Sequence, residues 1–122
     1  MILALAVALG AAFGAVARYL VDRAVAWRRD SVFPAGTWVI NITGSFILGL
    51  LTGLATQHVL PGDALVILGT GVCGGYTTFS TYSFESLRLM EDGAGLVAVA
   101  NLAGSIAAGL AAAALGLGLG AL

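Results

Sequence analysis

The chain has 122 residues, of which 60% are hydrophobic and only 9% are charged, and its mean hydropathy is +1.04. A soluble domain carries about 25% charged residues, so this composition excludes an ordinary globular protein and favours a single domain in the lipid bilayer. With 5 basic and 6 acidic residues and a net charge of -1, the chain has no basic surface for nucleic acid. Its single cysteine, Cys73, has no intrachain partner and is expected to be a packing residue.

The hydropathy pattern predicts four membrane-spanning helices, because a hydrocarbon core is crossed by about 20 apolar helical residues. We expect them at about residues 2–25, 34–57, 63–88 and 94–120. The first run has no basic segment and continues past a plausible cleavage point, so it is interpreted as a retained helix and not a signal peptide. Short connections force neighbouring helices antiparallel, which predicts an up-down-up-down bundle with both termini on one side.

The first span has glycines at four-residue spacing, Gly10 and Gly14, and an arginine near its end. Small residues at this spacing let helices approach closely in lipid, and Gly49 and Gly53 repeat the pattern in the second span. Arg18 either extends to the membrane interface or attracts anions into a vestibule, and both interpretations stay open.

The second span has a stripe of mostly polar residues at helical spacing. Facing lipid, such a stripe would leave its donors unpaired, so it must face another helix or a water-filled path. Both alternatives remain. The stripe comprises Thr37, Asn41, Ser45, Leu48, Thr52 and Thr56.

The second and fourth spans resemble each other at an offset of 60 residues. Asn41 to Leu50 matches Asn101 to Leu110 in five of ten places, and the match includes both asparagines of the chain. A duplication of two helices fits this pattern, although coincidence in a chain rich in Gly, Ala and Leu is the alternative. The two halves would then run parallel, so any inverted symmetry must come from a second subunit.

The third span is the least helix-like segment, with a break expected near residues 71–77. Gly74 and Gly75 followed by Thr77 and Thr78 predict a helix that is interrupted near the bilayer midplane, with a threonine capping its second half. Carbonyls at such a break can coordinate a cation, while amides and hydroxyls can bind an anion. A glycine kink filled by packing is the alternative interpretation.

Two neighbouring stripes follow the predicted break. Aromatic rings at helical spacing commonly serve packing alone, but their electropositive edges can also face an anion. Glu85 and Arg88 are a candidate i,i+3 ion pair, and no catalytic cluster is indicated. The first stripe comprises Phe79, Tyr82 and Ser86, and the second comprises Thr78, Thr81, Glu85 and Arg88.

Along nearly its whole length, the chain resembles the Fluc-type fluoride channels, also called the CrcB family. The segments that carry the resemblance are Gly10 to Tyr19, Gly36 to Phe46 and Gly71 to Ser83. The resemblance implies an all-α, multi-pass protein of the cell inner or plasma membrane that exports fluoride passively. It also implies an antiparallel, dual-topology homodimer with two pores and a central structural sodium ion that is not transported.

The resemblance further implies roles for individual residues. Backbone carbonyls of Gly74 and Thr77 look like sodium ligands, and Arg18 looks like a vestibule arginine. Asn41 and Phe79 look like fluoride contacts, and Glu85 matches an acid near the outer part of the pore. Tyr82 stands at the second aromatic position, and the hydroxyl neighbours would be Thr78, Ser80, Thr81 and Ser105.

The chain departs from this family pattern in two ways. Tyr82 replaces the usual phenylalanine, which adds a hydroxyl that could bond the ion or a neighbouring group. The basic residues Arg23, Arg28, Arg29 and Arg88 all fall on one side of the four-span arrangement, which favours a single orientation with both termini outside over dual insertion. Because so few charges are involved, we follow the family on this point.

Fluoride is small and strongly hydrated, so a pore must replace its water with donors such as amides and hydroxyls. The spans contain no mid-membrane carboxylate or histidine for proton coupling, which favours passive conduction. A small multidrug transporter is one alternative function, although such proteins need a membrane-embedded acid that the first span lacks before Asp22. A non-conducting channel subunit is the other alternative.

Overall fold

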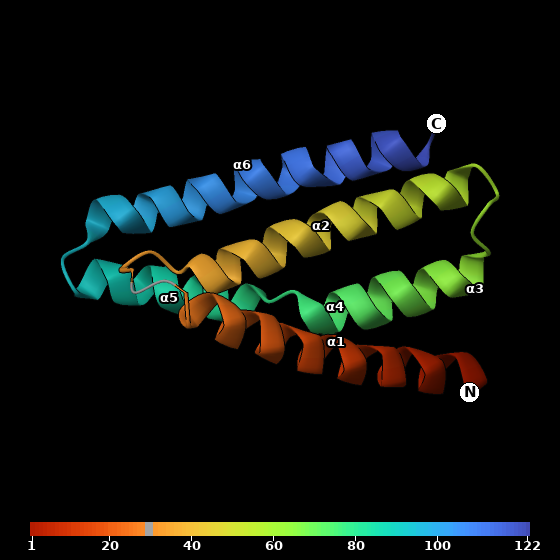
Figure 1. The fold of residues 1–122 in the computed structure, drawn as a ribbon, viewed down its shortest axis with the longest axis horizontal. Coiled ribbons are helices and arrows are strands. Elements are labelled where there is room, and N and C mark those ends of the chain that lie inside the picture. The colour runs from red at the N-terminus through yellow and green to blue at the C-terminus, as the bar shows by residue number, and fades with distance from the viewer. Residues whose placement is uncertain (29–30) are drawn as a thin grey trace.

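The computed structural model describes residues 1–28 and 31–122, so Arg29 and Asp30 lie outside the described part of the chain. The described residues form an all-helical bundle in which the chain runs along the bundle four times, each time antiparallel to the time before (Figure 1). The third of these crossings is interrupted. The elements are α1 (Ile2–Ala26), α2 (Ala35–Thr56), α3 (Gly62–Leu65), the π-helix η1 (Val66–Cys73), α4 (Gly74–Tyr76), α5 (Phe79–Glu91) and α6 (Gly95–Gly120).

Three uninterrupted helices, α1, α2 and α6, are long and apolar enough to cross a membrane. The third crossing runs through α3, η1, α4 and α5, and α2 and α6 run parallel on one side of it (Figure 1). The amino and carboxyl termini lie at the same end of the bundle, as the four-span prediction expected. Arg23, Arg28 and Arg88 lie at the opposite end, while Arg29 is outside the described residues.

The interruption of the third crossing lies at Thr77 and Thr78, later than the glycines suggested. Gly74 and Gly75 are still helical because they belong to a segment that packs against α1. A Cβ on Gly75 would collide with the Ala11 backbone, and one on Gly71 would lie 2.9 Å from the Val7 carbonyl oxygen. Gly71 and Gly75 therefore permit close packing against α1, whereas the threonines mark the break.

The first half of the third crossing is a π-helix of 8 residues, which the sequence analysis did not predict. The second half continues to Glu91, beyond the expected end near residue 88. Its buried residues, Tyr82, Ser86 and Leu89, follow helical spacing and face α6. Because Leu89 completes this buried face, extending the helix by another turn buries more apolar surface.

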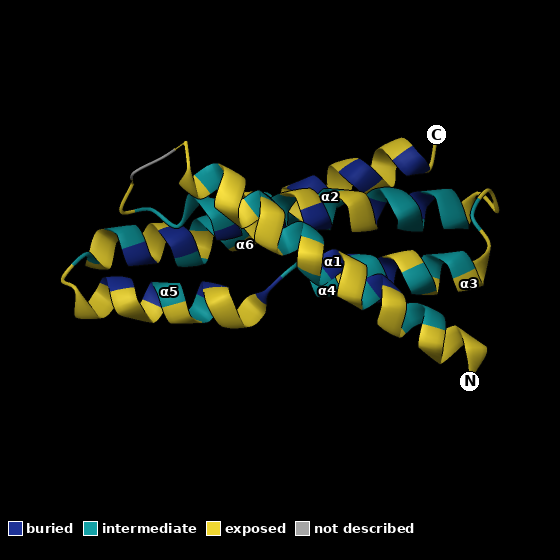
Figure 2. Cartoon of the chain, turned by 60° about the horizontal axis from the view of Figure 1, so that its bottom comes forward, coloured by how far each residue is buried: buried dark blue, intermediate teal, exposed yellow. Residues whose placement is uncertain are grey.

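Exposed residues run along the outer sides of the helices (Figure 2), and many of them are large and hydrophobic, as expected for a protein that faces lipid. Along α1 only Gly10 and Gly14 are buried, so this helix contacts the bundle through its small residues. Gly49 and Gly53 do the same for α2, since added Cβ atoms there would meet the backbone of α6. Both glycine pairs therefore serve tight helix packing.

Replacing Gly14 with alanine is expected to destabilise the bundle by about 1–3 kcal/mol, because overpacking forces neighbouring backbones apart. The new methyl group would collide with the Val72 carbonyl and lie 2.8 Å from the Tyr76 nitrogen. The matched control is Gly118→Ala, since nothing lies within 4 Å of a Cβ there. Thermal unfolding in detergent measures both variants, and an equal melting temperature for the two would contradict the packing role.

Candidate functional site

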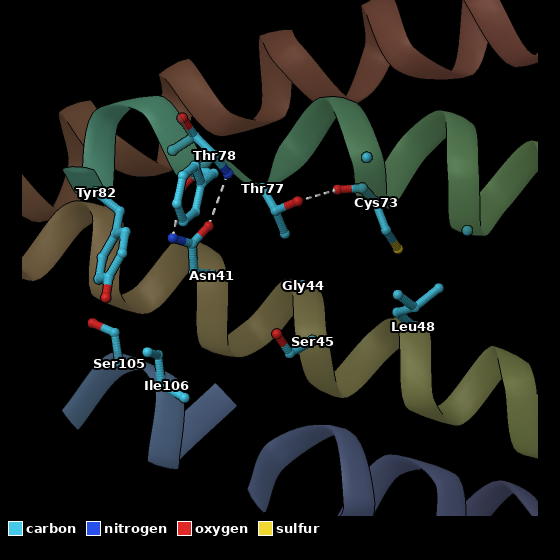
Figure 3. Close-up of a pocket in the computed structure, with 13 residues that line it drawn as sticks. Asn41, Gly44, Ser45, Leu48, Cys73, Thr77, Thr78, Tyr82, Ser105 and Ile106 are labelled. Carbon is cyan, nitrogen blue, oxygen red and sulfur yellow. Dashed lines mark hydrogen bonds between the residues drawn. The ribbon is translucent and has the colours of Figure 1, made fainter. Parts of the chain in front are cut away.

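The break in the third crossing is held by the side chain of Asn41 on α2. Its amide nitrogen donates to the Thr78 carbonyl at 2.9 Å, and its oxygen accepts from the Thr78 backbone N–H at 2.8 Å (Figure 3). This two-point contact replaces the helical hydrogen bond that the Thr78 N–H would otherwise give to the Gly74 carbonyl. One amide hydrogen of Asn41 remains for another acceptor, because the group carries two.

Asn41 lies in a groove of about 360 Å³ between α2, the third crossing and α6 (Figure 3). The lining contributes one amide and several hydroxyls, and it contains no charged side chain. The aromatic rings of Phe79 and Tyr82 form part of the same wall. The full lining is Asn41, Gly44, Ser45, Leu48, Gly69, Cys73, Gly74, Thr77, Thr78, Phe79, Tyr82, Ser105 and Ile106.

Hydroxyl groups cap the start of α5, directly after the break. The Thr78 hydroxyl accepts from the Thr81 backbone N–H at 3.2 Å, so the threonine N-cap that the sequence predicted is Thr78, the second of the pair. It also contacts the hydroxyls of Thr81 at 3.0 Å and Ser80 at 3.3 Å. The positive end of the α5 dipole therefore lies at the groove, among hydroxyl groups.

The two aromatic residues of the groove differ in exposure. Phe79 is 80% exposed and Tyr82 only 8%, and their ring centroids lie 5.7 Å apart. The Tyr82 hydroxyl donates to the Leu102 carbonyl on α6 at 2.9 Å. The hydroxyl that distinguishes Tyr82 from phenylalanine thus ties α5 to α6.

Tyr82→Phe is expected to lower the free energy of unfolding by about 0.6 kcal/mol and at most about 1.7 kcal/mol, the range for interhelical hydrogen bonds in membranes. The change removes only the hydroxyl that reaches Leu102. Tyr19→Phe is the matched control, because Tyr19 is 62% exposed on α1. A larger loss of stability for Tyr19→Phe in detergent melts would contradict the assigned contact.

Arg18 turns inward to the break and not outward to the membrane interface. Its guanidinium donates to the Thr77 carbonyl at 3.3 Å. Arg18 also lines a second cavity of about 380 Å³, with Asp22, Thr37, Ser80 and Thr81 among its other lining residues. Thr78 lines both this cavity and the groove, so the two spaces meet at the capped end of α5.

Glu85 lies beside Thr37 of α2 and does not line the groove. The expected ion pair with Arg88 is wrong, since Arg88 instead approaches Asp92 at 3.9 Å. The reason is geometric: Arg88 and Asp92 lie one helical turn apart at the exposed end of α5, whereas Glu85 faces α2.

The polar stripe of α2 divides between the two roles that the sequence left open. Asn41 and Ser45 line the groove, together with the apolar Leu48. Thr52 and Thr56 instead bond carbonyls of their own helix, at 2.8 Å to Leu48 and 2.6 Å to Gly53. Only the middle of the stripe therefore faces the groove.

Several lining residues were not predicted as part of a site. Cys73, Gly44, Gly69 and Ile106 are apolar or small, and their types give no functional signal in an apolar chain. Gly44 does have a packing reason, because an added Cβ would collide with the Thr77 side chain. Its position one turn from Asn41 is the only pattern that could have indicated it.

The chain is similar to proteins of known family. Residues 5–117 match the family described as CrcB-like protein, Camphor Resistance (CrcB). A protein of Streptomyces avermitilis named fluoride-specific ion channel FluC 1 is 55% identical over 85% of this chain and 84% of its own length. A Frankia casuarinae protein of the same name is 51% identical over 90% and 89% of the two chains. A Mycobacterium tuberculosis protein named fluoride-specific ion channel FluC 2 is 52% identical over 84% and 79%.

Proposed function

This chain belongs to the CrcB-like protein family, and from that premise we propose that it forms a passive, fluoride-selective pore that exports cytoplasmic fluoride. It is a multi-pass protein of the cell membrane and not an enzyme. The observation that carries the proposal is the uncharged groove around Asn41, whose polar groups are an amide, hydroxyls and ring edges.

The groove offers what a strongly hydrated small anion needs in place of water. The free amide hydrogen of Asn41 and the hydroxyls of Ser45 and Ser105 are donors, and the positive end of α5 adds a favourable field. Ring edges of Phe79 and Tyr82 carry partial positive charge. Because no lining group is ionised, an anion binds weakly enough to leave again, which conduction requires.

The second cavity supplies an approach to this groove. Arg18 attracts anions there, and Asp22 limits how tightly they are held. An ion then passes the hydroxyls of Ser80 and Thr81 and reaches Thr78, which borders both spaces. Glu85 lies beside Thr37, which lines the second cavity, so we place the Glu85 side chain next to this route.

One copy of the chain leaves the groove open, and a second copy would close it. Phe79 projects from the break with 80% of its surface exposed, and Gly74 beside it is also exposed. A polar groove open to lipid would be costly, so we place an antiparallel second copy of this chain against the break. Such a homodimer would contain two equivalent pores.

The same break suits a structural sodium ion at the dimer centre. The Gly74 carbonyl lacks its usual helical partner, because the Thr78 N–H donates to Asn41. The Thr77 carbonyl has one lone pair engaged by Arg18 and a second one free. Two carbonyls from each copy would give the oxygen donor set that a hard cation prefers. Through its positive charge, a sodium ion bound by these carbonyls would hold the breaks of the two copies together.

Purified protein in liposomes tests the proposed function. Fluoride efflux is expected to exceed chloride efflux strongly, without any imposed proton gradient. Equal chloride efflux, or efflux that depends on a proton gradient, would contradict a fluoride-selective passive pore. Absence of any fluoride flux would favour a non-conducting subunit.

Labelling in whole cells tests the antiparallel arrangement. A cysteine added after Leu122 in a Cys73→Ser background is expected to react from both sides of the membrane. Labelling from one side alone would rule out dual topology and would follow the one-sided arginine distribution instead.

A further inference from the structure

A second polar cluster lies between α5 and α6, centred on the other asparagine of the chain. Asn101 is 1% exposed and Ser86 is 2% exposed, and neither residue lines the groove. The Asn101 amide nitrogen donates to the Ser86 hydroxyl at 2.9 Å, and the Asn101 oxygen accepts from the Ser105 hydroxyl at 3.2 Å. This cluster connects buried residues to Ser105, which does line the groove.

The hydrogen bonds of this cluster fix the direction of every proton. The Ser86 hydroxyl donates to the Tyr82 carbonyl at 2.7 Å, so its oxygen must accept from Asn101. The amide nitrogen of Asn101 therefore faces Ser86, and the amide oxygen faces Ser105. Since an amide oxygen only accepts, Ser105 must be the donor of the last bond.

Ser105 behaves differently from four other hydroxyl residues of the chain. Thr43, Thr52, Thr77 and Ser86 each donate to the carbonyl four residues earlier, at distances of 2.7 to 2.9 Å. Ser105 instead donates to the side chain of the residue four positions earlier, at 3.2 Å. Asn101 thus intercepts a hydroxyl that would otherwise bond to the helix backbone.

We propose that Asn101 is a positioning residue that keeps the Ser105 proton available to an anion in the groove. The proposal rests on the proposed fluoride function. A bond of 3.2 Å is longer than the usual 2.7–2.8 Å for a hydroxyl donor and is correspondingly easy to give up. When fluoride arrives, the Ser105 hydroxyl rotates from Asn101 to the ion; when fluoride leaves, it returns.

The arrangement also gives a reason for the internal repeat of the chain. Asn41 on α2 contacts the start of α5, and Asn101 on α6 contacts its middle. Both amides reach the same half-helix from the two parallel helices beside it. Asn41 holds the break in place, and Asn101 positions the Ser105 hydroxyl, which faces the groove across from the break.

A double-mutant cycle in liposomes tests this inference. Asn101→Leu is expected to reduce fluoride flux per folded dimer about tenfold, because Ser105 then bonds to its own backbone. Ser105→Ala is expected to cause a similar loss, and the double variant should lose no more than either single one. A merely structural role for Asn101 would instead add to the effect of Ser105→Ala.

Asn101→Ser serves as the second variant if leucine prevents folding, because it shortens the side chain without adding an apolar group. Unchanged flux in Ser105→Ala, or additive losses in the double variant, would overturn the inference. If neither Asn101 variant folds, Asn101 is required for folding itself, and the inference is overturned as well. Wild-type protein in the same liposomes separates the two proposals, since absent wild-type flux contradicts the fluoride function itself.

Discussion

Asn41→Asp is expected to reduce fluoride flux by at least about 100-fold while leaving the protein folded. The carboxylate can still accept the Thr78 backbone N–H at the position of the present 2.8 Å bond. It cannot donate to the Thr78 carbonyl, and it offers an anion in the groove a negative charge in place of a donor. Fluoride efflux from liposomes measures the loss, and size-exclusion chromatography reports the folded state.

The matched control for this substitution is Gln57→Glu, which makes the same chemical change at the exposed end of α2. The Gln57 amide donates to the Ala121 carbonyl at 2.8 Å, far along the helix from the groove. Flux in this variant should match that of the wild type. If Asn41→Asp keeps the wild-type flux, Asn41 does not lie on the conduction path.

Phe79→Ile is expected to reduce fluoride flux by at least about tenfold, because it replaces a ring edge with an aliphatic group of no favourable polarity. Folding of the single chain should tolerate the change, since Phe79 is 80% exposed, with its ring centroid 5.7 Å from that of Tyr82. Fluoride efflux per reconstituted protein is the measurement.

Phe84→Ile is the appropriate control because Phe84 lies on the same helix, is 64% exposed and does not line the groove. Its flux should stay at the wild-type value. Equal losses in the two variants would mean that aromatic bulk on α5 matters generally and that Phe79 has no special place in the pore.

The parts of the fold that depend on the residues of a single helix could be predicted from the sequence. Apolar length located the three uninterrupted helices, and the threonine pair after two glycines indicated the cap of a half-helix, which is Thr78. The grouping of Asn41, Thr78 and Phe79 in one groove agrees with the expected sites, although their role in conduction stays a prediction.

Features that depend on contacts between helices could not be predicted from the sequence. The π-helix at Val66–Cys73 arises in a segment that packs against α1 at Gly71 and against α2 at Gly69, and glycine spacing alone does not distinguish α from π geometry. The inward turn of Arg18 and the partner of Arg88 were likewise decided by three-dimensional neighbours. The same holds for Ser105, whose hydroxyl would be assigned to its own backbone if Asn101 were not beside it.

The placement of both termini at one end of the bundle has a consequence for engineering (Figure 1). A short peptide that joins two copies end to end would force them to insert in the same orientation. A single polypeptide containing the proposed antiparallel pair would need a connector that itself crosses the bilayer an odd number of times. Such a fused chain would fix one copy of each orientation and allow the two grooves to be altered independently.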